Sequence, residues 1–394
     1  MSVTVHSLGC RLNLSESETL RGLLAPDDDL VVVNSCAVTA EAMRQTRQTI
    51  RRARRERPAA RLLVTGCAAE VEREAIARMP EVDGLVPNQA KLDPRVWNVP
   101  APVPRPQPGH DGAYSRAFVA VQNGCDHACT FCVIPQGRGP ARSRPVAEVL
   151  ETIGLHLEAG AREVVLTGVD LSSWGPDLRA DARLGELVAA ILRRFPKLPR
   201  LRLSSIDGAE IDAQLLDLLA HEPRLMPHLH LSLQSGDDMI LKRMKRRHTR
   251  RDAAALVETL RAARPDLAVG ADLIAGFPTE DEAMHAANLS AIADLGIVHG
   301  HVFPYSPRAG TPAARMPQVA RPTIKARAAE LRAAVAAERM RWLEGLVGTP
   351  LSVLAESDGT GHAANFAPVR LPEGTARAAL IDLTPRAVVE GMLQ

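Results

Sequence analysis

The sequence predicts an α/β protein with an amino-terminal parallel α/β domain, a central partial (β/α)6 barrel and a small carboxy-terminal β-barrel. Short apolar segments alternate with helical segments as far as residue 345. A proline-rich stretch interrupts this alternation, and beyond Pro350 short strand-like segments are separated by turn residues. We therefore expect domains at 1–98, 114–345 and 346–394, with a linker at 99–113.

Three predicted strands of the amino-terminal domain each end at a cysteine. The strands are 2–9, 30–33 and 61–65, and the cysteines are Cys10, Cys36 and Cys67. A helix is expected to begin at Asn13, because Ser15 and Glu18 have the spacing of a capping box. A single such cysteine is readily explained as a small buried residue. Three at equivalent strand ends favour a site with three thiolates, because the carboxyl ends of parallel strands share one edge.

The central domain repeats a strand and helix pattern typical of a parallel sheet. Its predicted strands are 117–121, 163–167, 201–204, 228–233, 268–274 and 297–303, followed by a helix from about 321 to 345. Glycine or polar residues stand at most of the strand ends, where barrel folds place their active sites. In the carboxy-terminal domain we expect strands at 351–356, 364–371 and 376–383.

The loop after the first barrel strand carries Cys125, Cys129 and Cys132 with the spacing Cys-x3-Cys-x2-Cys. No fourth cysteine follows in this loop, so an iron-sulfur cluster held here would keep one iron open to a ligand. The alternative is a zinc site that takes His127 or a distant residue as its fourth ligand. The spacing is uncommon for zinc and therefore favours the cluster.

Together with Gly124, the Thr130-Phe131 pair and the run from Gly137 to Gly139, this loop resembles that of the radical S-adenosylmethionine methylthiotransferases. The resemblance implies a 4Fe-4S cluster whose open iron binds S-adenosylmethionine, and one electron then produces a 5′-deoxyadenosyl radical. The amino-terminal patterns, Gly9 to Asn13, Asn34 to Val38 and Gly66-Cys67, also match the family. They imply a second 4Fe-4S cluster that carries the sulfur or methylthio group.

The resemblance also implies that the barrel strand ends hold S-adenosylmethionine. The residues expected to contact it are Phe131, Gly168, Asp170, Ser204, Gln234 and Gly276. Gly168 to Asp170 match the motif that meets the methionine amino group, and Phe131 lies where the loop meets the adenine. The carboxy-terminal β-barrel resembles the RNA-binding (TRAM-like) module that ends many members.

The runs 168–175 and 137–140 look most like those of members that act on threonylcarbamoyl-adenosine beside the tRNA anticodon. The implied partners are a tRNA anticodon stem-loop, S-adenosylmethionine, an electron donor and a sulfur source. Two alternatives stay open. One is the same chemistry on isopentenyl-adenosine in tRNA or on an aspartate of a ribosomal protein. The other is a non-catalytic RNA-binding iron-sulfur protein.

The formal net charge is only +2, so local basic runs must carry any RNA contact. The candidates are Arg51, Arg52, Arg54 and Arg55 on a predicted helix, and Lys242 and Arg243 after the fourth barrel strand. A solvated helix face explains each run equally well. Aromatic residues make up 3% of the chain, which argues against an extended stacking surface for RNA. Without an apolar segment long enough to span a bilayer, we expect a cytoplasmic protein and no membrane partner.

Overall fold

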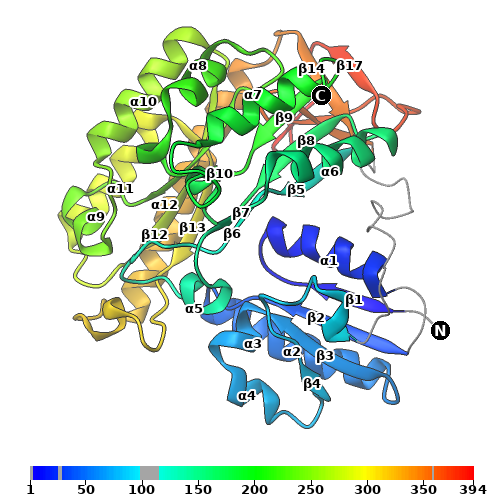
Figure 1. Ribbon diagram of the computed structural model, residues 1–394. Coiled ribbons are helices and arrows are strands. Elements are labelled where there is room, and N and C mark those ends of the chain that lie inside the picture. Colours follow the sequence, from blue (N-terminus) through cyan, green and yellow to red (C-terminus); the bar gives the residue numbers. More distant parts are fainter. Residues whose placement is uncertain (1–2, 25–28, 98–114, 357–358) are drawn as a thin grey trace.

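The computed structural model describes residues 3–24, 29–97, 115–356 and 359–394. These residues form a parallel amino-terminal sheet, a barrel with helices around it, and a mixed sheet at the carboxyl end (Figure 1). The linker predicted at 99–113 lies outside the described residues. The domain boundaries at 98, 114 and 346 stay predictions.

The amino-terminal sheet is parallel, with the strand order β1-β2-β3-β4. Its elements are β1 (Thr4–Ser7), α1 (Arg11–Leu24), β2 (Leu30–Ser35), α2 (Ala40–Glu56), β3 (Arg61–Gly66), α3 (Cys67–Val71), α4 (Arg73–Ala77), β4 (Gly84–Leu85) and the 3-10 turn η1 (Pro94–Trp97). Successive β2 side chains enter opposite cores, Val33 with Ile50 of α2 and Val32 with Leu20 of α1. Both faces of β2 are therefore buried.

Helix α1 begins at Arg11, so the capping box predicted at Ser15 and Glu18 is wrong. Ser15 lies inside the helix, and its hydroxyl donates to the backbone carbonyl of Phe118 at 2.9 Å. This hydrogen bond fastens α1 to the first barrel strand, β5 (Arg116–Ala120).

The predicted partial barrel is confirmed. Five of its six strands begin and end within one residue of the prediction, and the third, at 200–206, ends two residues later than predicted. After β5 its strands are β8 (Glu163–Thr167), β9 (Arg200–Leu203), β10 (Ser205–Ile206), β11 (His228–Gln234), β12 (Ala268–Ala275) and β13 (Ile297–Pro304). Ser204 separates β9 from β10 within the third strand, so β9 pairs with β8 and β10 with β11. All these pairs are parallel.

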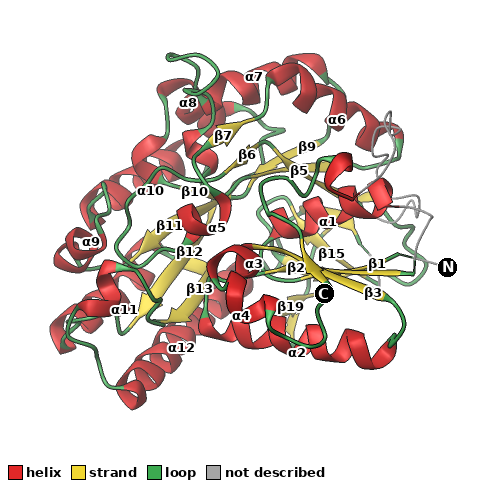
Figure 2. Cartoon of the chain, turned by 60° about the horizontal axis from the view of Figure 1, so that its bottom comes forward, coloured by secondary structure: helices red, strands yellow, loops and turns green. Residues whose placement is uncertain are grey.

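Helices cover the outer side of the barrel strands (Figure 2). They are α6 (Val146–Glu158), α7 (Leu184–Arg194), α8 (Ala213–His221), α9 (Asp238–Met244), α10 (Arg250–Ala263), α11 (Glu282–Leu295) and α12 (Arg321–Gly345). The cysteine loop is framed by β6 (Gln122–Asn123), α5 (Ile134–Arg138) and β7 (Arg142–Ser143). Short 3-10 turns are η2 (Leu171–Ser173), η3 (Gly208–Glu210) and η4 (Pro312–Arg315).

The carboxy-terminal strands form one mixed sheet in the order β17-β14-β15-β16-β19-β18. They are β14 (Leu351–Ala355), β15 (Thr360–Ala363), β16 (Pro368–Arg370), β17 (Leu380–Leu383), β18 (Val388–Val389) and β19 (Met392–Leu393). The strand predicted at 364–371 is wrong in its first half, because the chain turns at Phe366, whose φ is 70°. This turn lets β15 and β16 pair antiparallel.

None of the helices in the described ranges is both long and apolar enough to cross a membrane.

Candidate active site

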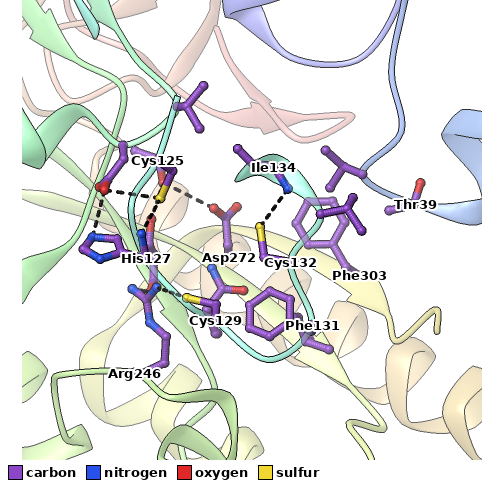
Figure 3. Close-up of a pocket in the computed structure, with 18 of the residues that line it drawn as sticks. Thr39, Cys125, His127, Cys129, Phe131, Cys132, Ile134, Arg246, Asp272 and Phe303 are labelled. Atoms are coloured by element: carbon purple, nitrogen blue, oxygen red, sulfur yellow. Dashed lines mark hydrogen bonds and ion pairs between the residues drawn. The ribbon is translucent and has the colours of Figure 1, made fainter. Parts of the chain in front are cut away.

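Cys125, Cys129 and Cys132 face a cavity of about 280 Å³ at the carboxyl ends of the barrel strands (Figure 3). Each sulfur accepts a weak hydrogen bond from an N–H group. The backbone N–H groups of His127 and Ile134 lie 3.4 Å from the sulfurs of Cys125 and Cys132, and Arg246 Nη1 lies 3.7 Å from the sulfur of Cys129. Hydrogen bonds to the sulfurs are among the features that tune protein-bound iron-sulfur clusters.

Burial raises the pKa of Cys125 to about 12 and that of Cys132 to about 11. Without metal these thiols keep their protons at neutral pH, whereas a coordinating thiol is deprotonated. Three thiols with N–H donors beside a cavity therefore fit a 4Fe-4S cluster that has an open iron.

His127 pairs with carboxylates. Its Nε2 lies 2.8 Å from Asp170 Oδ2 and 3.6 Å from Glu210 Oε1. The hydrogen bond to Asp170 raises the pKa of His127 to about 10. These contacts hold the His127 ring at the carboxylates of Asp170 and Glu210.

The residues expected to contact S-adenosylmethionine fall into two groups. Phe131, Asp170 and Gln234 line the cavity. Gly168, Ser204 and Gly276 are not part of its lining, and at those strand ends the cavity is lined by Val169, Ser205 and Ile274 instead. Successive residues of a strand point to opposite faces, so a strand-end motif places only some of its side chains on the cavity.

The amino-terminal cysteines follow neighbouring strands, Cys10 after β1, Cys36 after β2 and Cys67 after β3. Burial raises the pKa of Cys36 to about 11, and the nearby Cys67 and Cys10 add to that rise. A Cβ atom on Gly9, whose φ is 89°, would lie 2.6 Å from the Cys36 sulfur. Only glycine lets the end of β1 come this close. Three thiols at one sheet edge fit a second three-thiolate cluster.

The amino-terminal sheet meets the cavity through the loop after Cys36. Val38 and Thr39 line the same cavity as the barrel cysteines. The Arg308 guanidinium, which follows β13, donates to the backbone carbonyls of Ala37 and Thr39. The Cys36 loop is therefore held at the rim of the barrel.

A second contact joins Cys67 to the barrel cysteine loop. Helix α3, which begins at Cys67, packs against α5 (Figure 1). A Cβ atom on Gly137 would lie 3.1 Å from the Cβ of Cys67. Asn88 Nδ2 lies 2.6 Å from the Gly137 carbonyl and 3.9 Å from the Cys67 sulfur. The two cysteine triplets thus lie on elements in direct contact.

Glu16, Lys91 and Arg138 form a buried charge cluster beside these elements, and their side chains are 3%, 1% and 2% exposed. Lys91 Nζ lies 2.6 Å from Glu16 Oε2, and Arg138 Nη1 lies 2.9 Å from Glu16 Oε1. Two cations face one carboxylate. Burial raises the pKa of Cys67, and the positive charges of Arg138 and Lys91 oppose that rise.

Asp272 lies on the cavity floor and is surrounded by hydrogen-bond donors. His230 Nε2 and His301 Nδ1 each lie 3.1 Å from Asp272 Oδ1, and the Ser205 hydroxyl donates to Oδ2 at 3.3 Å. Burial alone would raise the pKa of Asp272, but the hydrogen bonds from the two histidines hold it below its usual range. The floor therefore carries an ionised carboxylate at neutral pH.

The arginines proposed for RNA binding differ in how exposed their side chains are. Arg51, Arg52 and Arg55 are exposed on α2. Arg54 is held against the sheet by the carbonyls of Glu81 and Ala60, at 2.9 and 2.7 Å, and by Asp83 Oδ2, at 2.6 Å. These contacts leave its side chain only 21% exposed.

In the second basic run, Lys242 is exposed, whereas Arg243 is partly buried and donates to the carbonyl of Thr279 at 3.3 Å. Arg246, four residues after Lys242, points inward to Asp207 Oδ2 at 2.8 Å and lines the cavity. This basic run therefore contributes Arg246 to the cavity wall and Lys242 to the protein surface.

The model of the Radical SAM superfamily matches residues 119–289, and that of the uncharacterized protein family UPF0004 matches residues 2–87. Among solved structures, the radical S-adenosylmethionine methyltransferase TsrM from Kitasatospora setae aligns with a TM-score of 0.52 and 16% identity, over 74% of this chain and 64% of TsrM. The cobalamin-dependent enzyme OxsB aligns with a TM-score of 0.53 and 12% identity, over 85% of this chain and 56% of OxsB. At these identities the likeness concerns the fold.

A relative from Rickettsia prowazekii, the threonylcarbamoyladenosine tRNA methylthiotransferase MtaB, is 40% identical over 99% of this chain and 96% of its own length. A tRNA-2-methylthio-N(6)-dimethylallyladenosine synthase from Erythrobacter litoralis is 35% identical over 90% of this chain and 86% of its own. Both relatives are methylthiotransferases, and the chain itself therefore belongs to the radical S-adenosylmethionine methylthiotransferase family.

Proposed function

We propose that this enzyme adds a methylthio group to threonylcarbamoyl-adenosine beside the tRNA anticodon, using two 4Fe-4S clusters and S-adenosylmethionine. The substrate is supported by the Rickettsia relative, which is named for threonylcarbamoyladenosine and is similar over nearly its whole length. The Erythrobacter relative, at 35% identity, keeps dimethylallyl-adenosine as the second candidate. An electron donor and a sulfur source would come from outside the chain.

The observation that carries this proposal is that the loop after Cys36 reaches the cavity that the barrel cysteines line. Cys125, Cys129 and Cys132 line it, and Val38 and Thr39 bring the loop after Cys36 to the same wall. When bound, the two clusters and S-adenosylmethionine supply the radical and the sulfur chemistry. Sulfur insertion at a carbon requires both activities at one carbon atom, and the approach of the Cys36 loop to the barrel cavity supports such an arrangement.

The protein's own residues hold and orient these groups. The six cysteines bind the clusters, and Phe131, Asp170 and Gln234 form the cavity wall available to S-adenosylmethionine. Arg246 Nη1 at the Cys129 sulfur places a positive charge beside the first cluster site. The buried group of Glu16, Lys91 and Arg138 has one more positive charge than negative charge. This excess favours the negative charge that three thiolates bring to the second cluster site.

Mass spectrometry of tRNA nucleosides tests the substrate. Cells that contain this chain should hold 2-methylthio-threonylcarbamoyl-adenosine, and cells that lack it should hold the unmethylthiolated nucleoside. A change confined to dimethylallyl-adenosine would reassign the substrate within the family. An unchanged set of tRNA nucleosides would exclude tRNA as the substrate.

A further inference from the structure

The inner face of the barrel carries a polar and aromatic set next to the cysteine loop. β11 contributes His230, β12 contributes Asp272, and β13 contributes His301 and Phe303. Asp272 and Phe303 both line the cavity that holds the three barrel cysteines (Figure 3). The residues inferred to bind S-adenosylmethionine are Phe131, Asp170 and Gln234, so this set has no role in binding that molecule.

Asp272 and His301 form a pair of hydrogen-bond acceptors. A carboxylate has about four lone-pair positions, and His230, His301 and Ser205 occupy three of those on Asp272. The Nδ1–H of His301 donates to Asp272, so in the neutral ring its Nε2 accepts. His301 is 64% exposed, so a ligand that arrives from solvent can reach the pair.

Phe303 supplies an apolar surface beside these acceptors. It is 38% exposed although it lines the cavity, and Val38, on the same cavity wall, is 47% exposed. The ring of Phe303 lies 6.4 Å from that of His301. An exposed aromatic ring next to hydrogen-bonding groups is the usual arrangement for holding a base that has left its stack.

A cation lies at the same edge of the barrel. Arg332 of α12 donates through Nη2 to the backbone carbonyl of Val302 at 2.9 Å, and Val302 stands between His301 and Phe303. β13 is the last strand of its sheet, so this carbonyl faces the open side of the barrel. Arg332 thus places positive charge at the edge strand, beside the backbone between His301 and Phe303.

We propose, resting on the proposed function, that these residues form the subsite that distinguishes the N6 arm of the target adenosine. The base stacks on Phe303. The N–H and O–H donors of a threonylcarbamoyl arm meet Asp272 and His301, and its carboxylate meets Arg332. A dimethylallyl arm has no carboxylate and no donor beyond N6–H. It would leave these polar groups unpaired and therefore bind less tightly.

Binding of three anticodon stem-loop RNAs to the cluster-loaded protein tests this subsite. The RNAs carry threonylcarbamoyl-adenosine, dimethylallyl-adenosine or unmodified adenosine at one position, at one fixed salt concentration. The wild-type chain should bind the threonylcarbamoyl RNA about tenfold more tightly than the other two, as expected for hydrogen bonds that involve charged groups. Arg332→Gln and His301→Leu should remove most of this preference, and Arg321→Gln, an exposed arginine at the start of α12, should keep it.

Phe303 has a different expected signature. Phe303→Leu should weaken the binding of all three RNAs by about tenfold, because an aromatic ring stacks on any base. Phe303→Tyr keeps an aromatic ring and should bind all three RNAs with the wild-type affinity. A full threonylcarbamoyl preference in both Arg332→Gln and His301→Leu would overturn the subsite while leaving the proposed substrate in place. A wild-type chain that prefers the dimethylallyl RNA would overturn the subsite and the proposed substrate together.

Discussion

Replacing Glu16 by glutamine tests the buried charge cluster that joins α1 to the barrel cysteine loop. Among the described residues, Glu16 supplies the one carboxylate that pairs with Lys91 and Arg138. All three side chains are at most 3% exposed. Glutamine keeps the size of the side chain but leaves two cations in the interior without a counter-charge.

The expected cost is large. Breaking a buried ion pair by removing one partner typically costs about 3–5 kcal/mol, against a total stability of about 5–15 kcal/mol for a domain. At about 4 kcal/mol per molar of guanidinium, the unfolding midpoint of the amino-terminal part should fall by about 1 M. Lys91→Met should cost less, because Glu16 and Arg138 then remain as a matched pair.

Guanidinium unfolding of the reduced, metal-free protein measures this effect, followed by circular dichroism and tryptophan fluorescence. Trp97 is a local reporter, because its indole N–H donates to the Lys91 carbonyl at 2.7 Å. The control is Glu74→Gln, whose carboxylate is 84% exposed and pairs with Arg78. A surface pair is worth about 0–1 kcal/mol, so equal midpoints for Glu16→Gln and Glu74→Gln would refute the account.

Three further predictions concern RNA, pH and iron. Replacing the exposed arginines of α2 by glutamine should weaken tRNA binding and flatten its salt dependence by about 0.7–0.9 per lost phosphate contact, and an unchanged slope would remove α2 from the RNA site. Those arginines are Arg51, Arg52 and Arg55. Glu163 is fully buried. Burial alone would raise its pKa, but Arg202 and neighbouring arginines lower that pKa to about 2. Ionised Glu163 therefore stabilises the fold above its unfolded pKa of about 4.3, and this contribution, about 3 kcal/mol, is lost as the pH falls toward 2. In urea titrations of the metal-free protein, Glu163→Gln should remove that pH dependence. Gly9→Ala should lower the iron content because its Cβ would meet Cys36, whereas Gly348→Ala, with a similar φ of 82° and open space, should not.

The barrel was predictable because its strands are apolar runs bounded by glycine and polar residues, and each such run is long enough to fix one strand. The β15 and β16 hairpin was not predicted, although Asn365 and Pro368 on either side of Phe366 are turn-forming residues. Phe366 accepts a positive φ where its ring stacks on His362, with ring centroids 4.5 Å apart. A tertiary contact of this kind leaves no local pattern.

The spacing of the cysteines predicts their role, but no sequence pattern predicts the residues that support them. Lys91 is one lysine in an irregular segment, and its partner Glu16 lies 75 residues away along the chain. Arg246 belongs to a basic run of a kind typical of protein surfaces, but its side chain contacts the sulfur of Cys129. Asp272 does carry a signal in the sequence, because it is a carboxylate within an otherwise apolar strand.

The iron content of the anaerobically reconstituted chain tests the central claim that each of the two cysteine triplets holds its own cluster. Wild-type protein should bind about eight irons, and the variant with Cys125, Cys129 and Cys132 replaced by alanine should keep about four, as one cubane on the remaining cysteines. Mössbauer spectra of that variant should show a 4Fe-4S cluster. A triple variant that binds no iron, or a wild-type chain that saturates at about four, would contradict the account.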